Sequence, residues 1–111
     1  MSEAPEISPT ELNARWPNWT EQQDIVLLDI REPEELKLAM LENAKHIPMA
    51  EIPTRVCELN QDQPLIVMCH SGARSRQVAD FLASNGFAQV FNLAGGIDAW
   101  SREIDSDIPR Y

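Results

Sequence analysis

Residues 65–76 join a predicted strand to a predicted helix and read Leu65-Ile66-Val67-Met68-Cys69-His70-Ser71-Gly72-Ala73-Arg74-Ser75-Arg76. The four apolar residues that open this stretch are typical of a short strand buried on both faces. After Ser75, apolar residues recur at helical spacing, at Val78, Phe81 and Leu82. The sequence therefore places a tight turn, which starts at Cys69, directly before a helix N-terminus.

The setting of Cys69 predicts a reactive thiolate rather than a buried structural thiol. Backbone N–H groups at a helix N-terminus lack partners within the helix and carry a partial positive charge. With Arg74 and Arg76 nearby, they would favour the ionised sulfur, and comparable settings lower the pKa of a thiol from about 8.5 to roughly 3.5–7.5. Most free cysteines are small buried hydrophobes, but that role requires neither Gly72 nor two arginines. We therefore expect Cys69 to be a nucleophile.

The length and composition indicate one globular domain. The chain has 111 residues, of which 43% are hydrophobic and 24% are charged, and a chain of this length buries enough surface for a core without disulfides. We predict a single domain over residues 1–111, with residues 1–6 flexible. The two cysteines, Cys57 and Cys69, are too few for a disulfide scaffold. Cys57 lies beside an apolar helical stripe and is expected to be structural.

The formal net charge of −9 restricts the choice of partners. It argues against nucleic acid and against an anionic membrane surface, and no stretch is long enough for a membrane span. Residues 1–6 also lack the apolar run of a signal peptide, so we expect a cytoplasmic protein. Arg74 and Arg76 would form a cationic exception suited to a small anionic substrate, although the acidity could equally serve solubility alone.

The rest of the chain alternates predicted strands with predicted helices. Ser8 is a predicted N-cap, with Pro9 at the first helical position and Glu11 completing a capping box, and Pro17 ends that helix. Further helices are expected from Pro33 into residues 36–41, over residues 52–59, over about residues 75–85 and after residue 96. Further strands are expected over residues 25–30 and 89–93, with a short extended piece at 45–48.

This order of elements predicts an α/β fold, with a mostly parallel central sheet flanked by helices on both faces. Ligands of such sheets bind beyond the carboxyl ends of the strands. Asp29, Cys69 and Gly95 all fall at predicted strand ends, so we expect them to lie close together.

Four segments, in this order and spacing, resemble the rhodanese family of sulfurtransferases over nearly the whole chain, from Ile7 to Tyr111. They are Leu28-Asp29-Ile30-Arg31-Glu32-Pro33-Glu34, His46-Ile47-Pro48, Cys69-His70-Ser71-Gly72-Ala73-Arg74-Ser75 and Asn92-Leu93-Ala94-Gly95-Gly96-Ile97-Asp98-Ala99-Trp100. The family often has glycine where this chain has Lys45 and Met49, which leaves the shape of the middle segment open. The last helix also resembles that of rhodanese domains fused to sulfur-carrier-activating enzymes.

The resemblance implies a single rhodanese-like domain that acts as a thiosulfate sulfurtransferase. Such an enzyme moves a sulfane sulfur from thiosulfate or a persulfide donor to a thiophilic acceptor, which is cyanide, a thiol or a partner protein, through a persulfide on Cys69. The resemblance implies no cofactor. We expect no metal site, because no His or Cys pair is spaced to form one with His46, and we expect a monomer.

The resemblance and the local chemistry together assign roles to the site residues. The loop His70, Ser71, Gly72, Ala73, Arg74 and Ser75 is expected to surround the transferred sulfur and to direct backbone N–H groups at it. Asp29 and Arg31 match family residues that brace the loop from the neighbouring strand end. His70 is expected to line the loop rather than to act as a base, and Ser75 to cap the helix.

The two arginines leave alternatives open. Arg74 is expected to make a charge-assisted contact with an anionic donor, and the alternative is an ion pair with one of the many carboxylates of the chain. Arg76 either steers the substrate or lies on a solvated helix face. His46 is expected to pack and hydrogen-bond inside the domain, and the tryptophans to be core or half-buried anchors, at Trp16, Trp19 and Trp100.

Three other functions fit parts of the pattern. Cysteine phosphatases and arsenate reductases resemble C-x-x-x-x-x-R, with one more residue than the four that separate Cys69 from Arg74, and the tighter loop favours sulfur over a phosphoryl group. Rhodanese-like binding modules commonly lack the cysteine that is present here. A protein-to-protein persulfide carrier in sulfur-cofactor or tRNA thiolation would use the same residues, so the sequence does not separate it from a thiosulfate enzyme.

Overall fold

A five-stranded parallel sheet forms the centre of the molecule in the computed structural model, which describes residues 3–22 and 24–111. The strands are β1 (Glu6–Ile7), β2 (Val26–Asp29), β3 (Lys45–His46), β4 (Leu65–Met68) and β5 (Val90–Leu93). They lie in the order β1-β5-β4-β2-β3, and each neighbouring pair is parallel. The predicted parallel sheet is confirmed, with β4 at its centre between β5 and β2.

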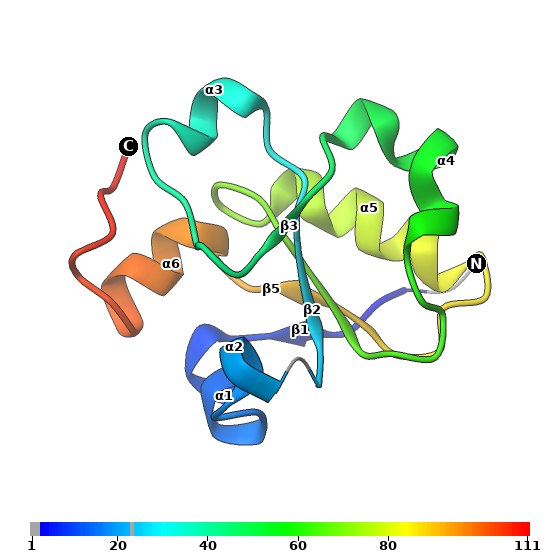
Figure 1. Ribbon diagram of the computed structural model, residues 1–111, viewed down its shortest axis with the longest axis horizontal. Coiled ribbons are helices and arrows are strands. Elements are labelled where there is room, and N and C mark those ends of the chain that lie inside the picture. The colour runs from blue at the N-terminus through cyan, green and yellow to red at the C-terminus, as the bar shows by residue number, and fades with distance from the viewer. Residues whose placement is uncertain (1–2, 23) are drawn as a thin grey trace.

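Helices cover both faces of the sheet, as predicted (Figure 1). α4 (Ile52–Arg55) and α5 (Ala73–Ala83) lie on one face, and α1 (Pro9–Arg15), α2 (Trp19–Gln22) and α6 (Gly96–Glu103) lie on the other. The remaining helical pieces are α3 (Pro33–Leu36) and the 3-10 helices η1 (Met49–Glu51) and η2 (Val56–Glu58). Within the described ranges, each helix is too short or too polar to cross a lipid bilayer.

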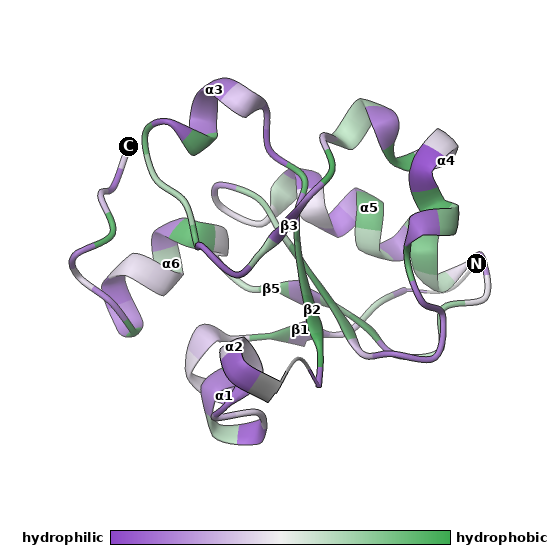
Figure 2. Ribbon diagram, in the orientation of Figure 1, coloured by the Kyte–Doolittle hydropathy of each residue, from purple (hydrophilic) through white to green (hydrophobic). Residues whose placement is uncertain are grey.

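The central strands build a separate core on each face, because side chains alternate in direction along a strand. Leu28 and Val67 belong to the core beneath α5, together with Val78 and Leu82 from that helix. The opposite core contains Leu12, Leu27, Ile66, Met68 and Trp100. The central strands are hydrophobic in Figure 2, whereas the helices carry hydrophilic stretches. Fully burying one such side chain contributes about 1.5–3 kcal/mol, so the two cores fix the sheet and the loops at its ends.

The first helix begins as the sequence predicts. The Ser8 hydroxyl accepts a hydrogen bond from the Glu11 N–H at 3.1 Å, and the Ser8 N–H donates to the Glu11 carboxylate at 3.2 Å. This reciprocal pair is the predicted capping box. The helix ends at Arg15, before Pro17.

The helix predicted from Pro33 into residues 36–41 is wrong beyond Leu36, where α3 ends. The Arg31 guanidinium donates to the carbonyl oxygen of Ala39 at 2.8 Å, so this carbonyl is held by a side chain instead of a helical N–H. The side chains of Ala39 and Leu41 are also buried in the core opposite α5. These contacts hold residues 37–41 as irregular chain along the sheet.

Two short elements, β1 and α2, are not predicted by the sequence, because each is too short to show a periodic pattern. Of residues 1–6, which the sequence predicts to be flexible, Met1 and Ser2 lie outside the described residues. Ala4 is buried, and the Asn92 N–H donates to the carbonyl oxygen of Pro5 at 2.9 Å. This segment therefore docks along β5.

Candidate active site

The loop between β4 and α5, residues 69–72, lies at the carboxyl end of the central strand. The start of α6 docks against it. The Ile97 N–H donates to the carbonyl oxygen of Cys69 at 2.9 Å, and the Asp98 N–H donates to that of His70 at 3.1 Å. Because these carbonyl oxygens turn toward α6, the loop presents N–H groups to its own interior. The loop lies at the edge of the sheet where the sequence predicts it.

The Cys69 sulfur lies inside this loop, and the residue is only 1% exposed. Its Sγ accepts hydrogen bonds from the Gly72 N–H at 3.1 Å, the Ser75 N–H at 3.4 Å and the Ser75 hydroxyl at 3.3 Å. Burial by itself raises the pKa of the thiol. The hydrogen bonds from Ser75, Gly72 and Ser71 outweigh this effect, so the pKa of Cys69 lies below its ordinary value. The loop therefore stabilises an anionic sulfur.

The turn into α5 depends on Gly72, which is the N-cap residue with a φ of +106°. Glycine adopts this left-handed conformation without the steric cost that a side chain brings. The helix begins at Ala73, so the prediction that Ser75 caps it is wrong. The Ser75 hydroxyl instead points into the interior, where it lies 2.5 Å from Oδ1 of Asn92.

Asn92, which is fully buried in β5, is a site residue that sequence reasoning missed. Its Nδ2 donates to the Gly72 carbonyl oxygen at 3.1 Å and to the Glu6 carboxylate at 3.0 Å. Its Oδ1 must therefore face the Ser75 hydroxyl, which has Asn92 Oδ1 and the Cys69 sulfur as its two acceptors within reach. The available signal is one polar residue within the apolar run of β5.

Arg74, the arginine of the loop, is paired with Glu35 from α3. Its Nη1 and Nη2 donate to the two carboxylate oxygens at 2.7 and 2.9 Å. Hydrogen bonds from Arg74 are the main cause that lowers the pKa of Glu35 to about 2, and the Tyr111 hydroxyl contributes to the same shift. The pair with Glu35 raises the pKa of Arg74, and the charge on the Cys69 thiolate adds to the rise. Of the two roles considered for Arg74, the structure contains the ion pair.

Tyr111 is a second residue that sequence reasoning missed at this site. Its ring stacks on the ring of His70, with centroids 4.1 Å apart and planes 11° apart. Its hydroxyl donates to Glu35 at 2.7 Å and accepts from Arg31 at 2.9 Å. The C-terminal segment accordingly ends beside α3, as Figure 1 shows. His70 thus contacts an aromatic ring at the rim of the loop.

Asp29 and Arg31 form a buried ion pair beside the loop. The Nε and Nη2 of Arg31 donate to the carboxylate at 2.9 and 2.7 Å, and the two side chains are 2% and 0% exposed. Arg31 also reaches Ala39 and Tyr111. The pair therefore fixes residues 31–39, the segment that carries Glu35, and it is linked to the Cys69 loop through that segment.

Arg76 and His46 are bound within the protein. Arg76 donates to Asp80 at 3.2 Å and forms an ion pair with Glu6 at 3.2 Å, so of its two considered roles the structure favours the position on the helix face, where carboxylates pair with it. The Nε2 of His46 lies 2.7 Å from the carbonyl oxygen of Arg31. This hydrogen bond confirms the predicted internal role of His46.

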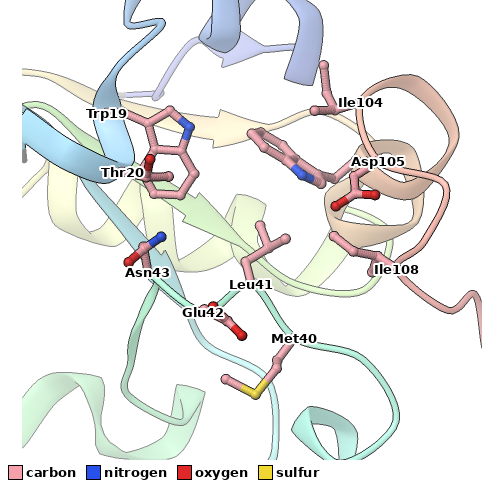
Figure 3. Close-up of a pocket in the computed structure, with 10 residues that line it drawn as sticks. Trp19, Thr20, Met40, Leu41, Glu42, Asn43, Ile104, Asp105 and Ile108 are labelled. Atoms are coloured by element: carbon pink, nitrogen blue, oxygen red, sulfur yellow. The ribbon is translucent and has the colours of Figure 1, made fainter.

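A cavity of about 400 Å³ lies on the α6 side of the sheet, away from the loop. Trp19 and Trp100 are buried beside it, as predicted, and meet edge to face at 5.9 Å. Figure 3 shows Trp19, Leu41 and Ile108 around this space. No residue of the 69–75 loop lines it, so it is separate from Cys69. Among the residues that the structure describes, no group of three or more His, Cys, Asp or Glu side chains is arranged to hold a metal ion.

Comparison with known proteins agrees with this geometry. Residues 10–103 match the family model of the rhodanese-like domain. The chain is 42% identical over 80 residues to a sulfurtransferase of Allochromatium vinosum, which covers 72% of this chain and 75% of that one. It is 37% identical over 82 residues to the thiosulfate sulfurtransferase GlpE of Vibrio cholerae, at 74% and 77% coverage. A solved rhodanese-like domain protein of Staphylococcus aureus superposes with a TM-score of 0.78 at 29% identity, over 96% of this chain and 98% of that one.

Proposed function

The chain belongs to the family of rhodanese-like domains, and on this basis we propose that it is a sulfurtransferase that carries a sulfane sulfur on Cys69. The donor is thiosulfate or a persulfide, and the acceptor is cyanide, a small thiol or a partner protein. One observation carries the proposal: the Gly72 and Ser75 N–H groups converge on the Cys69 sulfur, at 3.1 and 3.4 Å. This is the arrangement that a nucleophilic thiolate needs.

In the first half of the reaction, the Cys69 thiolate attacks the outer sulfur of thiosulfate. A new sulfur–sulfur bond forms to Cys69 while the bond between the outer sulfur and the sulfonate sulfur breaks. The electron pair of the broken bond leaves with sulfite, and the terminal sulfur of the new persulfide keeps a negative charge. No oxidant or reductant is required.

In the second half, the acceptor attacks the terminal sulfur and the Cys69 thiolate leaves with the electron pair of the persulfide bond. A thiol of low pKa is the better leaving group in such exchanges. The hydrogen bonds that lower the pKa of Cys69 therefore assist both halves of the cycle. Residues 70–75 form the cradle in which the transferred sulfur sits, and Asp29 and Arg31 brace the segment beside it.

The size of the loop supports sulfur rather than a phosphoryl group as its cargo. The Gly72 N–H is already at hydrogen-bond distance from the Cys69 sulfur, and the carbonyl oxygens of residues 69 and 70 are bound by α6. A single sulfur atom needs less room than a tetrahedral oxyanion with three further oxygens. A cysteine phosphatase or arsenate reductase function is therefore the weaker explanation of the same loop.

A protein-to-protein persulfide carrier is the second candidate, favoured by the surface of residues 37–41. Leu38 and Met40 are 54% and 48% exposed, and they flank Ala39, which is tied to Arg31. Exposed apolar side chains on the segment that Arg31 holds suit contact with a protein acceptor. The carrier would use the same Cys69 persulfide.

The test is a sulfur-transfer assay with thiosulfate and cyanide, in which thiocyanate and sulfite are both measured. Cys57→Ser is the matched control, because Cys57 is the exposed cysteine. We expect equal formation of the two products by the wild type and by Cys57→Ser, and none by Cys69→Ser. Activity that survives in Cys69→Ser would refute the proposal.

A further inference from the structure

The charge of Arg74 is compensated before any substrate arrives. The two hydrogen bonds to Glu35 form a bidentate pair, the arrangement that fixes a guanidinium most firmly to a carboxylate. Glu35 is ionised at neutral pH, because Arg74 and Tyr111 lower its pKa to about 2. The pair therefore contributes no net charge at the loop, which is the second of the two alternatives that the sequence leaves open for Arg74.

Glu35 is held in this position by more than Arg74. Its carboxylate also accepts hydrogen bonds from the Tyr111 hydroxyl at 2.7 Å and from the Glu32 N–H at 3.2 Å. Tyr111 is itself fixed by its stacking on His70 and by Arg31. Glu35 is 18% exposed at its side chain, so the pair is preorganised rather than a transient surface contact.

We propose that Glu35 is a specificity-determining residue, which reduces the preference of the Cys69 loop for doubly charged donors over donors of lower charge. This inference rests on the proposed sulfurtransferase function. Two unit charges about 4 Å apart in water, such as a free Arg74 and one charge of a donor, change the binding constant of the donor about fivefold. A free Arg74 would strengthen the binding of a monoanion by this factor once and that of a dianion by this factor twice. The neutral pair strengthens the binding of neither donor.

The preference for doubly charged donors can be measured with two donors that react by the same chemistry. Thiosulfate carries two negative charges, and an aryl thiosulfonate carries one. In each case the Cys69 thiolate attacks the outer sulfur, and the electron pair of the broken sulfur–sulfur bond leaves with sulfite or with an aryl sulfinate. The ratio of kcat/KM for thiosulfate to kcat/KM for the thiosulfonate therefore reports donor charge at one catalytic centre.

The ratio is measured for the wild type, Glu35→Gln, Arg74→Met and the double variant. Glu35→Gln leaves Arg74 uncompensated, so the ratio rises about fivefold. Arg74→Met leaves Glu35 uncompensated, so the ratio falls about fivefold. The double variant carries no net charge at this place, so its ratio returns to the wild-type value. Glu34→Gln is the matched control, because this exposed neighbour on α3 loses the same charge, and its ratio stays unchanged.

The double variant keeps the test decisive where either single variant is too unstable to assay, because it leaves no unpaired charge. A double variant whose ratio falls as far as that of Arg74→Met would overturn the proposal, since Arg74 would then contact the donor itself. An equal rise in Glu35→Gln and Glu34→Gln would also overturn it. Absence of sulfur transfer from both donors in the wild type would instead refute the proposed function, which is a distinguishable result.

Discussion

A Cβ atom placed on Gly96 would overlap the carbonyl oxygen of Cys69. The same atom would lie 2.5 Å from the carbonyl oxygen of His70, and Gly96 has a φ of +59°. The backbone after β5 can therefore approach the Cys69 loop only because Gly96 has no side chain. The approach allows the N–H groups of residues 97 and 98 to hold those two carbonyl oxygens.

Gly96→Ala should therefore distort the Cys69 loop and also destabilise the domain. Left-handed strain costs about 1–2 kcal/mol, and displacing the tightly packed loop costs about 1–3 kcal/mol more. Gly86→Ala is the matched control, because Gly86 has a φ of +92° but the atoms nearest to its Cβ would belong to the Gln61 side chain, at 3.4 Å or more. Urea unfolding and sulfur transfer are measured on both. Equal loss of transfer at equal stability in the two variants would contradict the packing argument.

Ser75→Ala should raise the pKa of Cys69, because the Ser75 hydroxyl is one of the donors that lower it. A hydrogen bond to a charged group contributes about 1.5–3 kcal/mol, so alkylation of Cys69 at mildly acidic pH should slow about tenfold or more. The midpoint of the alkylation profile moves to higher pH. The measurement is made in a Cys57→Ser background, so that only Cys69 reacts. Ser71→Ala, which keeps its backbone N–H, is the control, and identical profiles for the two serine variants would contradict this role.

Asp29→Asn should destabilise the domain by about 3–5 kcal/mol, because it leaves the buried guanidinium of Arg31 without its charge partner. Glu58→Gln is the comparison, since Glu58 pairs with Arg55 at the surface, where water screens the ion pair and its loss has little effect on stability. The free energy of unfolding in urea measures both. If the two substitutions cost the same, the buried pair is not what fixes residues 31–39.

The Glu35–Arg74 pair should make stability depend on pH in the acid range. The pKa of Glu35 in the folded protein is about 2, below the ordinary value of 4.5. A carboxyl whose pKa is lowered by folding stabilises the protein above its unfolded pKa and stops doing so as the pH falls through the folded pKa. The free energy of unfolding of the wild type should therefore exceed that of Glu35→Gln by about 1 kcal/mol near neutral pH, after allowance for solvent screening.

This difference in unfolding free energy should shrink as the pH falls from about 4.5 to about 2. Urea unfolding at a series of pH values measures it, with Glu34→Gln as the control of equal charge. A difference that stays constant over this range would show that the pair is not formed in solution.

The sequence was sufficient for features that depend on neighbours along the chain. The capping box of Ser8 and Glu11 and the position of Cys69 before α5 are local patterns, and the alternation of strands and helices predicts the parallel sheet. Glu35 pairs with an arginine 39 residues away, and it meets Tyr111 across 76 residues. Nothing in the local sequence of either partner indicates that contact, so the compensated charge of Arg74 required the structure.

Ser75 and residues 37–41 show how tertiary contacts override local preference. Serine near a helix start is a good cap, yet Gly72 takes that place and Ser75 turns to Asn92 and the sulfur. Residues 37–41 follow a proline-led helix start, yet Arg31 takes the Ala39 carbonyl and ends the helix early. In both cases a buried polar partner decided the local conformation.

Intact-mass spectrometry after incubation with thiosulfate is the decisive test of a persulfide on Cys69, because it detects the sulfur on the protein itself. We expect that the wild type gains the mass of one sulfur atom, that peptide mapping places it on Cys69, and that cyanide or a small thiol removes it. Cys57→Ser should behave in the same way, and Cys69→Ser should gain nothing. A sulfur found on Cys57, or a wild-type protein that turns over thiosulfate without ever carrying sulfur, would show that Cys69 is not the sulfur carrier.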